Sequence, residues 1–141
     1  MTTLVIDASV TLGWYFPDEA NPAAEVAREY LATNQAVVPG LWWFEIRNSL
    51  LAGERRGRID AAQTAEIIAQ LDALPIDFDR EPNSSATLAL ARAHGLTFYD
   101  AAYLELALRA DAPLATLDRQ LARAARAAHV RLLGGRNLRV R

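Results

Sequence analysis

The sequence predicts a three-layer α/β/α sandwich with a mostly parallel central sheet. Short, continuously apolar segments alternate with longer segments in which apolar residues recur at helical spacing. Strands of a parallel sheet are buried on both faces and therefore read as unbroken apolar runs. Strands that alternate with helices favour a parallel sheet covered on both sides. With 141 residues, 52% of them hydrophobic, the chain fits one domain spanning residues 1–141.

The first half of the chain predicts two strands and four helices. A strand is expected at Thr3–Asp7, followed by a short helix that Ser9 caps and that stops near Pro17. Asn21 and Pro22 begin a second helix, which runs to about Thr33, because Asn is a preferred cap and Pro fits the first helical position. The other elements follow in order: a strand at 36–38, a turn at Pro39-Gly40, a helix from Leu41 to about Arg56 that ends at Gly57, and a helix capped by Asp60.

The second half continues the alternation. A weak strand is expected at Pro75–Phe78, and a helix runs from Pro82 or Asn83 to His94, where Gly95 stops it. The remaining elements are a helix that begins at Asp100, a strand at Leu114–Leu117, a helix capped by Asp118, and a last strand at Val130–Leu133 before a Gly-Gly turn and a basic tail.

Composition excludes several classes of protein. Without cysteine there can be no disulfide and no thiolate metal site. No apolar run approaches the roughly 18 residues of a membrane span, and the N-terminus lacks the basic region of a signal peptide. A cytoplasmic location is therefore expected.

The net charge of −2 does not indicate a nucleic-acid binder. All 15 basic residues are arginines, which codon bias in a GC-rich genome can explain. The net charge does not exclude a local phosphate-binding surface, because some arginines cluster in the sequence. The clusters are Arg55-Arg56-Gly57-Arg58 and, further along the chain, Arg131, Arg136, Arg139 and Arg141.

Four acidic residues stand in apolar settings, far apart in the chain: Asp7, Glu45, Asp100 and Asp118. A carboxylate removed from water costs several kcal/mol unless it is paired or bound to a cation. Asp7 and Asp118 follow predicted strands at their carboxyl ends, where parallel sheets bind ligands. Glu45 and Asp100 lie in the first turns of helices and can point to the same rim. The sequence therefore predicts a metal site there.

Each acid also has a structural explanation. Asp118 fits a helix N-cap, and Asp100 can cap its helix or interact with the helix dipole. Glu45 can be solvated on a polar helix face, although its aromatic neighbours leave that face narrow. Asp7 is hardest to explain in this way, because Ser9 is already expected to cap the first helix. One shared cation explains all four acids together.

The available ligands define the kind of metal. Carboxylate oxygens suit Mg²⁺ or Mn²⁺, whereas zinc would favour imidazole or thiolate. The chain has only two histidines, His94 and His129, and both are expected near helix C-termini rather than as ligands. The sequence therefore favours a hard cation.

Four motifs resemble those of the PIN-domain ribonucleases, and specifically of the VapC-type toxins of type II toxin–antitoxin systems. They stand in the same order and at typical separations: Leu4-Val5-Ile6-Asp7-Ala8-Ser9, Glu45-Ile46-Arg47-Asn48-Ser49-Leu50, Tyr99-Asp100-Ala101-Ala102-Tyr103 and Ala115-Thr116-Leu117-Asp118-Arg119-Gln120-Leu121. Each motif is short, but the ordered set of four is fairly specific and covers nearly the whole chain.

This resemblance implies an endoribonuclease dependent on Mg²⁺ or Mn²⁺, in which metal-activated water hydrolyses an RNA phosphodiester. The catalytic and metal-binding acids would be Asp7, Glu45, Asp100 and Asp118, with Asp7 and Asp100 the best candidates for direct ligands. Ser9 and Thr116 would line the site or orient its ligands, and Asn48 would support Glu45. No acid is missing, so an active member is expected.

The same resemblance implies two protein partners, a cognate antitoxin and a second copy of the chain. An antitoxin arginine in the acidic pocket would compete with Mg²⁺. The aromatic runs Trp14-Tyr15-Phe16 and Trp42-Trp43-Phe44 are expected either at such contacts or in the core. RNA specificity would depend on surface arginines such as Arg55, Arg56, Arg119 and Arg123.

Two other classes of function also use clustered acids and Mg²⁺. A metal-dependent phosphatase with an aspartyl nucleophile usually needs a second Asp two residues after the first, where this chain has Ser9. A Mg²⁺-binding receiver or adaptor domain, which is not an enzyme, would signal through a partner. Both classes usually place a lysine near the phosphate, and this chain has none.

Overall fold

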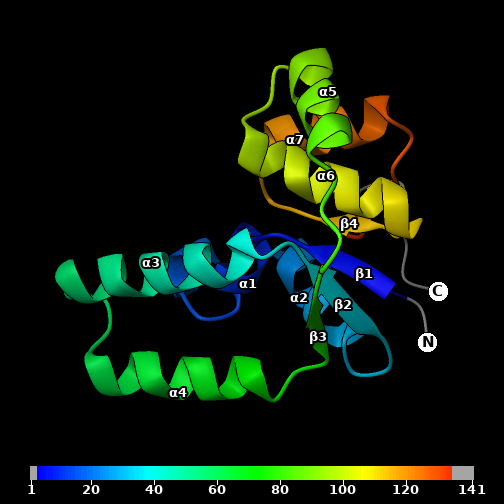
Figure 1. Cartoon of the computed structure of the whole chain (residues 1–141). Helices are drawn as coiled ribbons and strands as arrows, with labels where there is room; N and C mark the ends of the chain where they lie inside the picture. The colour runs from blue at the N-terminus through cyan, green and yellow to red at the C-terminus, as the bar shows by residue number, and fades with distance from the viewer. Residues whose placement is uncertain (1–2, 135–141) are drawn as a thin grey trace.

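A four-stranded parallel sheet organises the computed structural model, which describes residues 3–134 (Figure 1). The strand order is β3-β2-β1-β4, with β1 at Thr3–Ile6, β2 at Gln35–Val38, β3 at Ile76–Phe78 and β4 at Leu114–Ala115. Leu4 pairs with Ala36 of β2, and Ile6 pairs with Ala115 of β4. β1 is buried from Leu4 to Ile6, as its unbroken apolar sequence predicts, whereas β2 alternates between half-buried and buried residues.

Helices cover both faces of the sheet, so the predicted three-layer α/β/α fold is confirmed. On one side, α1 (Ala8–Gly13) packs on both α2 (Pro22–Tyr30) and α3 (Leu41–Arg55), and α3 packs on α4 (Ala61–Asp72). On the other side, α6 packs on β1 and β4 and also contacts its two neighbours. These helices lie together at the top of Figure 1: α5 (Ser84–His94), α6 (Phe98–Ala110) and α7 (Arg119–Ala127).

Several predicted boundaries are confirmed by their capping contacts. Asn21 caps α2 with Pro22 at the first position, and Asp60 caps α4 in a reciprocal pair with Gln63. Asn83 caps α5, which ends at Gly95 in a left-handed conformation, with φ +63°. A short 3₁₀ turn at Pro17–Glu19 separates α1 from α2, and α2 ends at Tyr30, slightly before the predicted Thr33.

Three predictions about elements are wrong. Ser9 does not cap α1, because the Oδ1 atom of Asp7 accepts the hydrogen bond from the Val10 N–H instead. Asp100 does not begin α6, because Thr97 caps that helix and Asp100 lies in its first turn. The strand predicted at Val130–Leu133 is reduced to one bridge between Leu114 and Leu132, since β4 has only two residues with which to pair.

Arg109 of α6 forms ion pairs with two acidic residues that do not belong to the predicted metal site. Its guanidinium donates hydrogen bonds to Glu105, one turn earlier, and to both carboxylate oxygens of Asp79, just after β3. Glu105 is only 5% exposed, and the Asp79 side chain is similarly shielded. This triad joins the last turns of α6 to the β3 edge of the sheet.

No helix within residues 3–134 is long and apolar enough to cross a membrane. The Gly-Gly turn and the basic tail, with Arg136, Arg139 and Arg141, extend beyond the described residues.

Candidate active site at the carboxyl end of the sheet

Asp7 is a buried carboxylate held by neutral donors. It follows β1 directly and is 5% exposed. Its Oδ1 atom accepts hydrogen bonds from the Ser9 hydroxyl at 2.6 Å and from the Val10 N–H at 3.1 Å. Its Oδ2 atom accepts a short hydrogen bond from the Thr116 hydroxyl. These contacts fix the carboxylate in one orientation without neutralising its charge.

Ser9 and Thr116 also bind the segment that follows β4. The Leu117 N–H donates to Ser9 Oγ, and the Asp118 N–H donates to Thr116 Oγ1, each at 3.0 Å. Both hydroxyls thus contact Asp7 and at the same time position the backbone that carries Asp118. The geometry is suited to the orienting role expected for Ser9 and Thr116, which stays a prediction.

Glu45 reaches across from α3 to α6. The Tyr103 hydroxyl donates a 2.6 Å hydrogen bond to Glu45 Oε1, and the Tyr103 ring is buried. Asn48 is exposed and makes no hydrogen bond with Glu45 within residues 3–134, so in this structure the observed support comes from Tyr103. Tyr103 was missed as a site residue, although a tyrosine in an aliphatic helix usually requires a partner for its hydroxyl.

Asp100 and Asp118 are more accessible than Asp7. Asp100 is half-buried in the first turn of α6, with its backbone N–H bonded to the Thr97 hydroxyl. Asp118 is exposed and caps α7 through a 2.8 Å hydrogen bond from the Leu121 N–H to Oδ1. The structural explanation of Asp118 as an N-cap is therefore correct, and its Oδ2 atom accepts no hydrogen bond among the described residues.

The four acids interact electrostatically around the rim. Burial, above all, raises the pKa of Asp7, and the charge of Asp118 raises it further. Burial also raises the pKa of Glu45, to which the charges of Asp7 and Asp100 add. The pKa of Asp100 is raised by burial and then by the charge of Asp118. Each acid thus lies within the field of at least two others, and the fold does bring the four together.

None of these acids forms an ion pair within the described part of the chain; the ion pairs found there join Arg58 and Arg109 to other acids. Within residues 3–134, however, no three acidic or histidine side chains are arranged as a ready set of metal ligands. The donors are carboxylate oxygens, which fit Mg²⁺ or Mn²⁺ chemically, so metal ligation by these residues stays a prediction.

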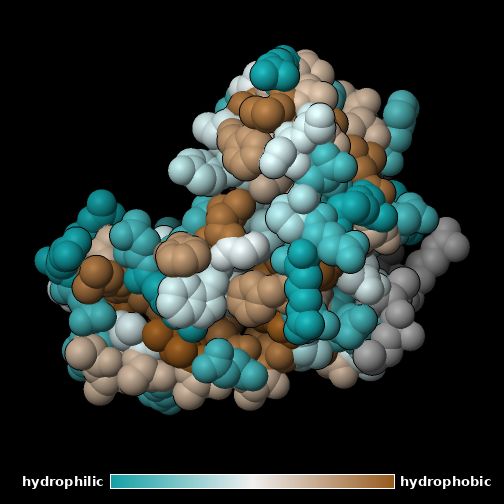
Figure 2. Space-filling view, in the orientation of Figure 1, coloured by the Kyte–Doolittle hydropathy of each residue, from teal (hydrophilic) through white to brown (hydrophobic). Residues whose placement is uncertain are grey.

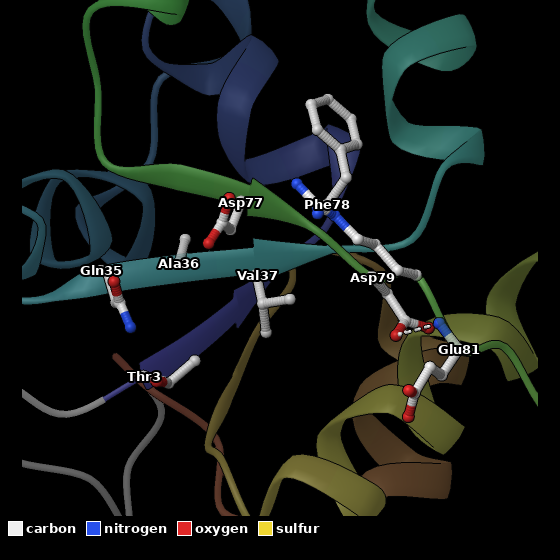
Figure 3. A pocket seen from close by; sticks show the side chains of 9 residues that line it. Thr3, Gln35, Ala36, Val37, Asp77, Phe78, Asp79 and Glu81 are labelled. Atoms are coloured by element: carbon white, nitrogen blue, oxygen red, sulfur yellow. Dashed lines mark hydrogen bonds between the residues drawn. The ribbon is translucent and has the colours of Figure 1, made fainter.

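A surface pocket beside the sheet is separate from the four acids. A pocket of about 410 Å³ lies beside β2 and β3 and is lined by residues that include Gln35, Asp77 and Asp79 (Figure 3). None of the four rim acids lines it. Its acidic lining already includes Asp79, which accepts hydrogen bonds from Arg109 and from the Glu81 N–H.

Comparison with known proteins identifies the fold. The PIN-domain family model matches residues 4–127, a span that contains all four rim acids. The chain belongs to the PIN-domain family. It is also 36% identical over 123 residues to ribonuclease VapC3 of Pyrobaculum aerophilum, with 84% of this chain and 92% of that protein covered. The resemblance read from the four motifs is therefore confirmed.

Two solved structures share the architecture. The crystal structure of PAE2754 from Pyrobaculum aerophilum superposes with a TM-score of 0.69 at 24% identity, covering 87% of this chain and 84% of that one. A toxin–antitoxin complex from Klebsiella pneumoniae gives a TM-score of 0.59 at 16% identity, with coverages of 82% and 86%. At these identities the two structures support the fold alone.

The Tyr103 contact yields a direct prediction. Replacing Tyr103 with phenylalanine keeps the buried ring and removes only the hydroxyl that holds Glu45, so RNA cleavage should fall about 10- to 100-fold, as when other residues that orient a site are changed. The substitution Glu45→Gln should abolish most of this effect, because Tyr103 would then have no carboxylate to position. Initial rates of the two single variants and of the double variant measure the coupling between Tyr103 and Glu45. If the effects of the two substitutions on the rate simply multiply, Tyr103 does not act through Glu45.

Proposed function

We propose that this protein is an endoribonuclease that uses Mg²⁺ or Mn²⁺ to hydrolyse RNA phosphodiester bonds, as a VapC-type toxin. The observation that carries the proposal is the set of four acids at this edge of the sheet, none of which has a cationic partner among the described residues. The pKa values of Asp7, Glu45 and Asp100 are raised. The relative named ribonuclease VapC3 supports the reaction class.

We assign the four acids different roles, because they differ in solvent accessibility and in their hydrogen bonds. A bound divalent cation would supply Lewis acidity and a water of lowered pKa. Asp7 and Asp100 are assigned as its direct protein ligands; Asp7 is pre-oriented by Ser9 and Thr116, and Asp100 is accessible from the rim. Glu45, held at one oxygen by Tyr103, keeps the other free to bind through water or to position the attacking water. Asp118 would be a further ligand of the same ion or would bind a second ion.

A cleavage assay tests the proposal. Purified protein should cut RNA in Mg²⁺ or Mn²⁺ and lose this activity in EDTA, and sequencing of the RNA ends should reveal which sites are cut. A small phosphate ester should not be hydrolysed, which separates a nuclease from the phosphatase alternative. Metal binding without RNA cleavage would instead favour the receiver or adaptor alternative.

The proposal includes a cognate antitoxin and a homodimer. The Klebsiella pneumoniae neighbour is named as a toxin–antitoxin complex, which supports an antitoxin partner for this chain. Four acids without a cationic partner in residues 3–134 also suit an arginine supplied by such a protein, because guanidinium pairs bidentately with carboxylates. Competition between antitoxin and Mn²⁺ in a binding titration would test this part.

The raised pKa values predict how metal and pH affect stability. Asp7, Glu45 and Asp100 have higher pKa values in the folded state than in the unfolded chain, so their contribution to stability is present below about pH 4 and is lost as pH rises through the folded values. Saturating Mg²⁺ should offset this loss and raise the melting temperature by about 4–8 °C at pH 8.

The increase should shrink markedly towards pH 5, where protons compete for the same oxygens. Thermal unfolding in Mg²⁺ and in EDTA at both pH values measures the difference. The variant Asp77→Asn, which removes an exposed acid of β3, is the matched control and should respond to Mg²⁺ like the wild type. An increase that is equal at pH 5 and pH 8 would contradict the prediction.

A further inference from the structure

The most exposed large apolar side chains of the described residues stand beside the rim acids. Phe44 is 69% exposed and Tyr99 is 64% exposed, more than any other large hydrophobic residue within residues 3–134. Phe44 directly precedes Glu45, and Tyr99 directly precedes Asp100. Single exposed apolar side chains are common on protein surfaces, so what singles out these two rings is that each directly precedes a site acid in the sequence.

The two rings come from different helices that meet at the site. Phe44 lies in the first turn of α3 and Tyr99 in the first turn of α6. The Glu45–Tyr103 hydrogen bond joins these helices, and the charges of Glu45 and Asp100 act on each other. The surface is indented between the α5–α7 group and the helices below it (Figure 2). The two rings are thus each one residue away from a site acid, on two helices that the Glu45–Tyr103 hydrogen bond joins.

The faces of these two rings remain available. Phe44 meets the Trp43 ring edge-on, with centroids 5.0 Å apart and planes at 73°, a contact that steadies the ring while leaving it exposed. Trp43 is different, because the Arg47 guanidinium lies 4.0 Å from its ring centroid. Tyr99 makes no ring or cation–π contact within the described residues.

Phe44 and Tyr99 lie outside the pocket between α3 and α4. A pocket of about 300 Å³ between α3 and α4 is lined by Trp42, Trp43 and other residues but not by Phe44 or Tyr99. The residues of the two aromatic runs differ in burial: Phe16 and Trp42 are buried in the core, whereas Phe44 is exposed. Core packing, one of the two expectations for these runs, does not explain Phe44.

We propose that Phe44 and Tyr99 are stacking platforms for unpaired bases on either side of the phosphate at the acid rim. Aromatic rings bind single-stranded nucleic acid by stacking on base faces, largely irrespective of sequence. The platforms supply affinity without positive charge, which suits a rim where carboxylates repel phosphate. This inference rests on the proposed ribonuclease function, because it gives the rings a substrate at that site.

Fluorescence of 2-aminopurine, which stacking quenches, tests the platforms. The probe is a set of single-stranded RNA oligonucleotides with 2-aminopurine at each position in turn, bound in Mg²⁺ to protein carrying Asp7→Asn so that cleavage does not interfere. Quenching is expected at two positions. Phe44→Leu should relieve one of them and Tyr99→Leu the other, each weakening RNA binding by about tenfold. Phe44→Trp should restore both quenching and affinity.

Controls separate stacking from other roles. Phe78→Leu removes an exposed ring from β3 and should leave quenching and affinity unchanged. Replacing the quenched base with an abasic residue should remove the effect of the matching leucine variant. Unchanged RNA affinity in both leucine variants overturns the proposal, because the rings then do not bind RNA. A changed molecular mass of these variants in light scattering also overturns it and assigns the rings to a protein interface. Wild-type cleavage of RNA in Mg²⁺ is recorded in parallel, so failure of the platforms is distinguished from failure of the ribonuclease function.

Discussion

Asp7→Asn is expected to reduce Mg²⁺-dependent RNA cleavage by about a thousandfold or more while leaving the protein folded. The asparagine carbonyl can still accept hydrogen bonds from the Val10 N–H and the Ser9 hydroxyl, so α1 retains its cap. What is lost is the negative charge, which an oxygen-preferring cation requires. The prediction is measured by single-turnover cleavage of RNA at saturating Mg²⁺.

Stability gives the same variant a second signature. The Asp7 carboxylate is desolvated and its pKa is raised, so in the absence of metal its charge opposes folding at neutral pH. Asp7→Asn should therefore melt no lower than the wild type in EDTA and should gain less from Mg²⁺. Asp77→Asn serves again as the matched control, with activity and stability unchanged. Cleavage within tenfold of wild type in Asp7→Asn would remove Asp7 from the mechanism.

Arg109→Ala is expected to cost about 2–3 kcal/mol of unfolding free energy, a loss unrelated to the acid rim. Removing the guanidinium leaves Glu105 and Asp79 as neighbouring acids without their cation, and Glu105 is almost fully buried. Breaking a fully buried pair costs about 3–5 kcal/mol; the lower value expected here reflects an Arg109 side chain that is one-third exposed. Urea unfolding measures the loss.

A second substitution separates the buried charge from lost packing. Adding Glu105→Gln to Arg109→Ala should recover part of the stability, because the amide does not need a cation. In the wild type, the hydrogen bonds from Arg109 lower the pKa of Asp79, so this pair makes the unfolding free energy depend on pH. Its stabilisation is present above about pH 4 and is lost as pH falls further. Arg92→Ala, an exposed arginine of α5 without an ion pair in the described residues, should cost little. A loss below about 0.5 kcal/mol in Arg109→Ala would show that the triad is dispensable.

Much of the fold could be predicted because its signals are local. The Asn21-Pro22 pair, the Asp60 cap and the Gly95 stop depend on a few neighbouring residues, and all three are where the sequence places them. The caps of α1 and α6 were assigned wrongly because each segment offers two candidates a few residues apart. Which one caps the helix depends on where the backbone first becomes helical, and at α1 this is immediately after β1.

The site was predictable as a set of acids but not as a network. Charge in an apolar setting is visible in the sequence, and the strand ends indicated a shared rim. The hydrogen bond from Tyr103 to Glu45 joins residues 58 positions apart. Its existence depends on how α3 and α6 approach each other, which no local pattern encodes. The exposure of Phe44 beside a buried Trp42 depends in the same way on which face of α3 packs inward.

The contact between Asp7 and Thr116 spans 109 residues and has a consequence for synthesis of the protein. A ribosome makes Asp7 more than a hundred residues before Thr116, so the hydroxyl that holds one carboxylate oxygen of Asp7 is added late relative to the first strand. The surroundings of Asp7 are therefore complete only after the segment that follows β4 has folded onto the end of β1.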